Sequence, residues 1–283
     1  MDTKPSLNPL AKHFRQPEIY FKLPSGGKFW PEGSLELTVT GDIPVYPMTA
    51  RDEITLRTPD ALLNGQGVVD VIHSCCPNIK NAWLMPSIDV DATLIAIRIA
   101  SYGGNMSISA KCTNCSEEHE YDVPLGPLLT ANQMPNYNEK ILAGHIKVKL
   151  HPQQYFSVNQ TDKIRYEEQR ILAALTDNNS DEDTKLLSYS MHMTRIVDLN
   201  IQILLDSTEY IETEDGGIVT NRDFIKEFYN NCETQIINQI QDKIRNIASS
   251  MAKPNADVKC SGCSTEFQVE LAFDYSNFFV KGS

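Results

Sequence analysis

Two Cys-x-x-Cys pairs constrain the fold of this chain more than any other feature of its sequence: Cys112 with Cys115, and Cys260 with Cys263. Each pair flanks a tight turn and is followed by polar residues and an alternating segment typical of a strand. Four thiolates delivered by two short loops complete the tetrahedral coordination that Zn²⁺ prefers. We therefore predict one structural Zn²⁺ site, made of these four cysteines, that joins segments far apart in the chain.

The separation between the two pairs departs from a compact zinc ribbon, because 144 residues lie between Cys115 and Cys260. Loop-closure entropy grows only slowly with loop length, so a folded insertion is tolerable there. We predict a split zinc ribbon in which residues 267–273 form a strand beside residues 120–125. A redox Cys-x-x-Cys motif and disulfides are the alternatives, and the doubled spacing and the lack of a secretory signal disfavour both.

The other cysteines and the histidines do not suggest a second metal site. Cys75 and Cys76 end an apolar helical pattern and Cys232 lies on a later apolar stripe, so we expect all three to act as small hydrophobic residues. His119 follows Cys115 by four residues and is a less suitable ligand than the four cysteines. Four sulfur ligands leave no open position for a metal-bound water, and common catalytic motifs are absent, so we expect no enzyme.

Charge and hydropathy narrow the class of protein. The chain has 25 basic and 37 acidic residues, a net charge of −12, which repels phosphate backbones and argues against nucleic-acid binding. No apolar run approaches the roughly 20 residues that span a bilayer, and residues 1–17 lack the apolar core of a signal peptide. We therefore expect no membrane association and folding in the cytoplasm.

The predicted fold class is α+β, with a mainly helical insertion between the two knuckles. We divide the 283 residues into an N-terminal arm (1–18), an α+β domain with the first knuckle (19–126), the insertion (127–254), and the second knuckle with a strand and an aromatic C-terminal tail (255–283). This division makes the zinc site a link between the second and the fourth part.

Hydrophobic periodicity predicts the elements within these parts. Before the first knuckle we expect a strand at 35–39, helices at 50–57 and 89–100, and a helix that starts at Pro59 and is interrupted at Asn64 and Gly65. Within the insertion we expect an edge strand at 146–150 and helices at 162–175, 182–205 and 221–251. Thr220 and Asp223 can cap the last helix, whose apolar stripe comprises Phe228, Cys232, Ile236, Ile240, Ile244, Ile247 and Met251.

Four segments follow one another before the first knuckle: LPSGGKF at 23–29, IPVYPMTARDEI at 43–54, PDALLNG at 59–65 and LIAIRIASYG at 94–103. In this order they resemble the baseplate hub subunits of T4-like contractile-tailed bacteriophages, over roughly residues 20–125. The resemblance implies a structural protein of the tail baseplate, or a factor that assembles its central hub. It also implies assembly in the cytoplasm of the infected host and a place in the virion, and it supplies no catalytic residues.

The resemblance implies protein partners: other baseplate hub, tail tube, spike or tape-measure proteins of the phage. Candidate contact surfaces are the loop at 24–27 with Phe29 and Trp30, the insertion helices and the aromatic tail, although Phe29 and Trp30 fit an ordinary core equally well. Two other functions stay open. One is a hub assembly chaperone that is absent from the mature virion, and the other is a zinc-ribbon nucleic-acid-associated protein, which the charge disfavours.

Overall fold

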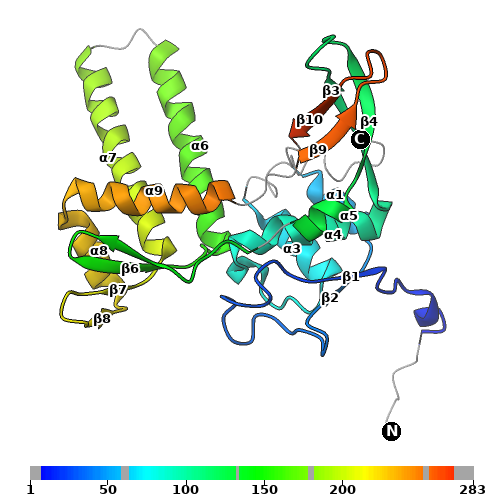
Figure 1. Ribbon diagram of the computed structural model, residues 1–283, viewed down its shortest axis with the longest axis horizontal. Coiled ribbons are helices and arrows are strands. Elements are labelled where there is room, and N and C mark those ends of the chain that lie inside the picture. Colours follow the sequence, from blue (N-terminus) through cyan, green and yellow to red (C-terminus); the bar gives the residue numbers. More distant parts are fainter. Residues whose placement is uncertain (1–7, 59–63, 132–133, 178–181, 251–254, 271–283) are drawn as a thin grey trace.

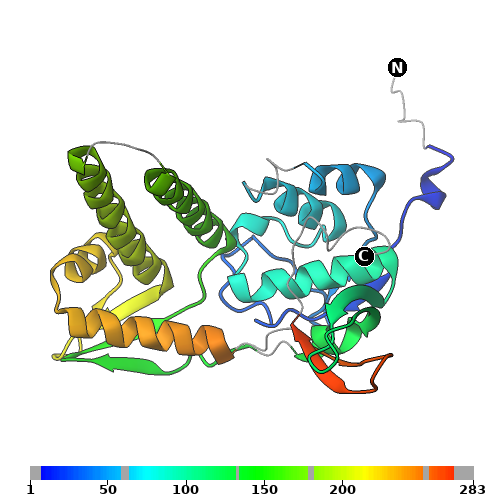
Figure 2. The ribbon, with the colours of Figure 1, turned by 90° about the horizontal axis from the view of Figure 1, so that it is seen from above.

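The computed structural model describes residues 8–58, 64–131, 134–177, 182–250 and 255–270. Helices and small antiparallel sheets form a mixed α+β fold, which confirms the predicted class. Two separate clusters of buried apolar side chains divide the described residues into two lobes, which lie side by side in Figures 1 and 2. We call residues 8–131 with 255–270 the first lobe and residues 134–250 the second lobe.

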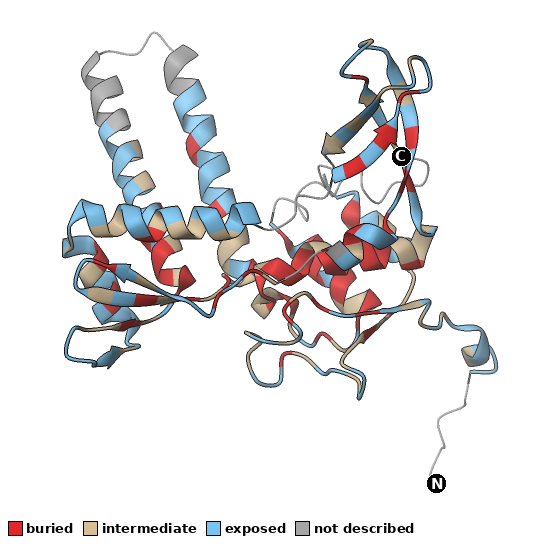
Figure 3. Cartoon of the chain, viewed as in Figure 1, coloured by how far each residue is buried: buried red, intermediate tan, exposed pale blue. Residues whose placement is uncertain are grey.

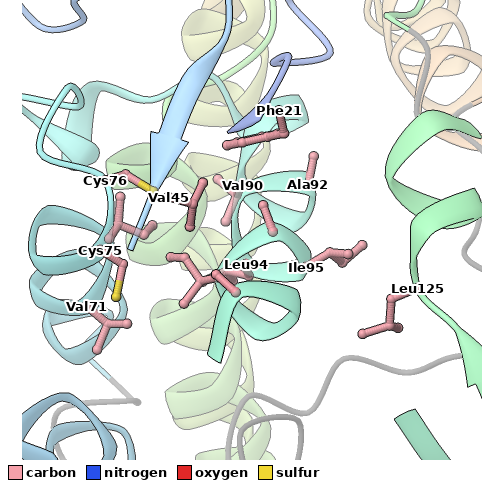
Figure 4. Packing of buried hydrophobic residues seen from close by; sticks show 14 of the residues in the cluster. Phe21, Val45, Val71, Cys75, Cys76, Val90, Ala92, Leu94, Ile95 and Leu125 are labelled. Atoms are coloured by element: carbon pink, nitrogen blue, oxygen red, sulfur yellow. The ribbon is translucent and has the colours of Figure 1, made fainter. Parts of the chain in front are cut away.

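Helix α4 (Ser87–Tyr102) is the centre of the first lobe. Its side chains are buried on nearly all sides, and Leu94, Ile95 and Ile97 are at most 1% exposed. A helix that is buried on nearly all sides belongs inside a core rather than on its surface. In Figure 4, Leu94 lies toward Val71 and Cys75 of helix α3 and Val45 of strand β2, whereas Ile95 lies on the side of Leu125. The remaining helices of this lobe are α1 (Ala50–Leu56), α3 (Gln66–Cys75), α5 (Gly126–Ala131) and the 3-10 turns Ala11–His13 and Ala82–Leu84.

The helix boundaries in the first lobe follow the predicted signals. Thr49 caps α1 in a capping box: its side chain accepts a hydrogen bond from the backbone N–H of Asp52, and Asp52 accepts one from the backbone N–H of Thr49. Helix α4 ends at Gly103, whose φ of 93° favours glycine. The helical start predicted at Pro59 lies outside the described residues, and α3 begins after Gly65.

The strand predicted at 35–39 is wrong. Strands β1 (Ile19–Phe21) and β2 (Ile43–Val45) pair with each other, and of the intervening segment only Leu35 makes an isolated bridge, to Ile79. The alternating pattern does not produce a strand because no neighbouring strand supplies a ladder of hydrogen bonds, and the chain contacts a loop near Asn78 instead.

The second lobe contains a four-stranded antiparallel sheet of β5 (Lys140–Ala143), β6 (Ile146–Leu150), β7 (Thr208–Glu212) and β8 (Ile218–Val219), in that order. Strand β6 has the predicted bounds, but it pairs on both sides, so its predicted place at the edge of a sheet is wrong. Its lysines do not protect an edge: the ammonium group of Lys147 lies 2.8 Å from the carboxylate of Glu212 on β7. Ion pairing with the neighbouring strand on one face of the sheet therefore explains why lysines alternate with apolar residues in β6.

Four helices complete the second lobe: α6 (Tyr155–Asp177), α7 (Glu182–Ser207), α8 (Arg222–Asn231) and α9 (Thr234–Ser250). The single helix predicted at 221–251 is wrong, because the chain becomes extended at Cys232. Apolar residues four apart from Phe228 to Ile244 drift by about 160° around a straight helix. The break lets both halves face one core, with Ile225 of α8 and Ile240 of α9 fully buried there. The observed cap is Asn221, not Thr220.

Candidate metal centre

The two knuckles occupy the turns of two hairpins in the first lobe. The first knuckle connects β3 (Asn105–Lys111) to β4 (Glu118–Pro124), and the second connects β9 (Asn255–Lys259) to β10 (Glu266–Glu270). The predicted pairing of 267–273 with 120–125 is therefore wrong for the described residues, and 271–273 lie outside them. Each strand instead pairs with the strand just before its own knuckle, where closing the loop costs least.

The hairpins contact each other through their side chains. The rings of Tyr121 on β4 and Phe267 on β10 meet edge to face, with centroids 5.7 Å apart. Tyr121 is 7% exposed and joins Ala256 and Val258 of β9 in the core of the first lobe. Apolar packing thus holds the two hairpins together below their turns.

The backbone of the two knuckles is nearly identical. Ser116 and Ser264, each directly after the second cysteine of its pair, have positive φ values of 61° and 60°. These two residues complete turns that aim backbone N–H groups and both sulfurs of a pair toward one point. The equivalent hydrogen bonds are Cys112 N to Glu117 O (2.9 Å), Ser116 N to Cys112 O (3.0 Å), Cys260 N to Thr265 O (2.9 Å) and Ser264 N to Cys260 O (2.9 Å).

The four predicted ligands meet at one place. The Sγ atoms of Cys112 and Cys263 are 3.6 Å apart, as are those of Cys115 and Cys260, and all four lie within 4.8 Å of one another. A tetrahedral ion with metal–sulfur bonds of about 2.3 Å requires sulfur–sulfur distances of about 3.8 Å. A disulfide requires about 2.05 Å, and all four thiols are free. The geometry fits a tetrahedral metal site.

Hydrogen bonds favour the thiolate form of Cys260 and Cys263, whereas at Cys115 the backbone of Glu117 lowers the pKa but burial and the neighbouring sulfurs outweigh it and raise the pKa to about 12. The contact with the hydroxyl group of Thr265 contributes most to lowering the pKa of Cys263 to about 5. The backbone N–H of Cys263 lowers the pKa of Cys260, and the backbone N–H of Asn114 lies 3.4 Å from the sulfur of Cys112. A set of four thiolates selects a soft or borderline metal such as zinc or iron over magnesium or calcium.

The other cysteines and His119 do not take part. Within the described ranges, the four knuckle cysteines are the one cluster of cysteine, histidine or carboxylate ligands that could hold a metal ion. Cys75 and Cys76 are buried, as predicted, and burial raises the pKa of Cys75 to about 12. Cys232 is only partly buried, against the second core. His119 lies 3.4 Å from the carboxylate of Glu117.

A buried carboxylate with no clear signature in the sequence holds the loop at 24–27. Asp89 is 0% exposed and accepts hydrogen bonds from Ser25 N (2.8 Å), Ser25 Oγ (2.6 Å) and Trp30 Nε1 (2.8 Å). Phe29 packs edge to face on Tyr137 of the second lobe, with centroids 5.6 Å apart. These contacts favour the core alternative for Phe29 and Trp30. The only signal in the sequence was a charged residue at the start of an apolar helix.

Comparison with protein families matches residues 16–280 to the family described as T4 bacteriophage base plate protein. The chain belongs to this family. The match covers both lobes and both knuckles, so it extends well beyond the resemblance at residues 20–125. No curated protein and no solved structure matches the chain.

Family membership supports a structural role in the tail baseplate of a phage, with other phage structural proteins as neighbours. None of the helices in the described parts of the chain is long and apolar enough to cross a membrane.

Proposed function

We propose that this baseplate protein is a structural component of the central hub, in which one Zn²⁺ ion held by Cys112, Cys115, Cys260 and Cys263 fixes the two hairpins to each other. The observation that carries the proposal is the convergence of four sulfur atoms, within 4.8 Å, from hairpins on either side of the second lobe in the sequence. When bound, Zn²⁺ supplies a cross-link and no reaction, because four protein ligands fill its coordination.

The position of the site in the chain explains what such a cross-link does mechanically. The second lobe follows β4 and precedes β9 in the sequence. A metal ion that joins the two knuckles therefore closes a loop, which consists of the polypeptide chain of the second lobe and the metal–sulfur bonds. Stacking of Trp83 on Tyr155, with centroids 5.5 Å apart, adds a third connection at the base of α6. A subunit that must hold several neighbours needs its lobes at a fixed relative orientation, and these links provide it.

The proposed role is non-enzymatic, with other hub, tail tube, spike or tape-measure proteins as partners. The net charge of −12 disfavours DNA as the partner. Membership of the baseplate family supports a structural role that needs no substrate. The cysteine site agrees with this, because four protein ligands fill the coordination of a structural metal.

The test is quantitative mass spectrometry of purified virions and isolated baseplates, together with zinc analysis of the recombinant chain. A structural hub component is present at a fixed ratio to the other hub proteins and carries one zinc ion per chain. Absence from virions, with recovery in assembly intermediates, assigns the protein to the alternative role of hub assembly chaperone. If the chain is present in virions but contains no metal, the result contradicts only the proposed zinc cross-link and not the proposed place in the hub.

A further inference from the structure

Helices α6 and α7 extend from the body of the molecule as a pair that the core covers only at its base (Figures 1 and 2). Figure 3 shows exposed residues along much of both helices, in contrast to the buried α4. Of the seventeen large hydrophobic side chains that are exposed in the described part of the chain, eight belong to this pair. They are Phe156, Ile164, Tyr166, Ile171 and Leu172 of α6, and Met191, Met193 and Val197 of α7.

A groove of about 730 Å³ runs between α6 and α7 and ends at α8; we call it the α6–α7 groove. Phe156 and Ile164, which are 50% and 38% exposed, line its α6 wall, and the buried Leu199 of α7 lies at its floor. The two α6 residues are eight positions apart, about two helical turns. A second helix can insert its own apolar side chains between residues at this spacing.

A buried ion-pair network fixes the walls of the groove. Glu168 of α6 is 3% exposed and contacts two side chains of α7: the ring of His192 at 2.5 Å and the guanidinium of Arg195 at 2.9 Å. Removing either partner would leave a buried charge incompletely compensated, so this contact holds α6 and α7 at their observed separation. The groove is therefore a preformed surface, and a ligand need not reorganise it.

The charges along the groove indicate what it binds. Glu167 on α6 and Asp198 on α7 line opposite walls, are exposed, and have no ion-pair partner among the described residues. The other charged groups of both walls are paired, Arg195 with Glu168 and Asp206 with Arg222, and Lys226 lies at the α8 end. The end of the groove near Glu168 and Arg195 thus presents two free carboxylates beside apolar side chains, a combination that suits a cationic amphipathic ligand.

We propose that the α6–α7 groove binds an amphipathic helix of another protein, whose apolar stripe packs on Phe156 and Ile164 and whose lysine or arginine side chains pair with Glu167 and Asp198. A second copy of this chain is disfavoured, because it would bring its own −12 charge to an acidic surface. The origin of the helix in a baseplate neighbour rests on the proposed function, whereas the groove itself does not involve the metal site.

Two synthetic helical peptides test the charge preference on the full-length protein. They share one leucine stripe, which is flanked by lysines in the first peptide and by glutamates in the second, and binding is measured by fluorescence anisotropy. We expect the lysine peptide to bind about tenfold more tightly, and the double variant E167K/D198K to reverse this preference. Ile164→Asp should abolish binding. Val197→Asp is the matched control, because Val197 is 59% exposed on α7 and does not line the groove.

Three results would overturn the proposal. Equal affinity for both peptides, or no binding, removes the charge argument. Equal weakening by Val197→Asp and Ile164→Asp shows general apolar adhesion instead of a groove. If the wild-type protein sediments as a dimer and Ile164→Asp dissociates that dimer, the occupant of the α6–α7 groove is a second copy of this chain. Zinc content and presence in baseplates are separate measurements, so these failures are distinguishable from failure of the proposed function.

A photo-crosslinking amino acid at position 164, with position 197 as control, identifies the natural partner in assembled baseplates. The proposal expects crosslinks from position 164 to a basic amphipathic helix of a different protein. Crosslinks to this same chain, or equal yields from both positions, would overturn it.

Discussion

The sulfur atoms of Cys112 and Cys263 lie 3.6 Å apart although the two residues are 151 positions apart in the chain. Cys115 and Cys260 form the equivalent pair at the same distance. Each close contact therefore joins one knuckle to the other, rather than the two cysteines of one turn. Loss of a metal from this site should separate the hairpins while each turn keeps its own backbone hydrogen bonds.

The double variant C260S/C263S tests this directly. Two hydroxyl groups cannot replace two thiolate ligands of zinc, so we expect the bound zinc to fall from about one ion per chain to near zero. Hydrogen exchange at residues 255–270 should become much faster, because the hairpin would keep only its apolar contacts. Cys232→Ser is the control and should keep its zinc, because Cys232 lies outside the metal cluster. Full zinc content in C260S/C263S would refute the site.

The sequence predicted that the four cysteines come together, but not the pairing of the strands that carry them. Cys-x-x-Cys spacing is a local property, since two thiolates on one tight turn are sufficient to define half a site. Strand pairing is not local: β9 is short and half polar, and only its contacts with β10 and with Tyr121 show that it belongs to a hairpin. Strong local signals also placed α1, through the Thr49 cap, and α4, through its apolar residues and the stop at Gly103.

Tertiary contacts explain the remaining errors. The break at Cys232 arises because two helical halves must face one core, which periodicity along a single helix does not show. Asp89 has no local signature because its partners, Ser25 and Trp30, are 64 and 59 positions away. Buried polar groups of this kind are recognised only once the fold has placed their donors.

Asp89→Asn should destabilise the protein by about 2–3 kcal/mol, because the NH2 group of asparagine replaces one of the two carboxylate oxygens and then faces a hydrogen-bond donor of Ser25 or Trp30. Denaturant unfolding measures the change. Asp70→Asn, on the exposed side of α3, is the control and should change stability by less than about 0.5 kcal/mol. Equal effects of the two substitutions would mean that the buried contacts of Asp89 contribute little.

The effect of Asp89 should also depend on pH. Burial raises the pKa of Asp89 above its usual 3.8, and the hydrogen bonds from Ser25 and Trp30 only partly oppose this. The folded state therefore keeps the proton over a range where the unfolded chain has released it. The contribution of this group to stability is complete below pH 3.8 and is lost as the pH rises through the folded pKa. Wild-type stability minus that of Asp89→Asn should therefore decrease over this range, and an increase would contradict the assignment.

Arg15 holds the N-terminal arm on the first lobe. Its guanidinium donates hydrogen bonds to the backbone oxygens of Pro47 (2.6 Å) and Ser74 (2.7 Å). Arg15→Ala should release the arm at a cost of about 1–2 kcal/mol, since these are hydrogen bonds from a charged, partly exposed group. Limited proteolysis should then cut near residues 8–14 faster than in the wild type. Lys12→Ala, an exposed change on the same arm, should leave the cleavage rate unchanged.

The two cores should respond separately to cavities, if the second lobe is a domain of its own. Ile240→Ala empties a fully buried position in the second core, and Ile95→Ala does the same in the first; each should cost about 2–4 kcal/mol. We expect Ile240→Ala to lower the unfolding temperature of the second lobe while the zinc content stays at one ion per chain. Ile95→Ala should instead weaken the lobe that carries the metal site. Differential scanning calorimetry with zinc analysis checks both, and one shared transition that the two variants shift equally would show that the lobes unfold as a unit.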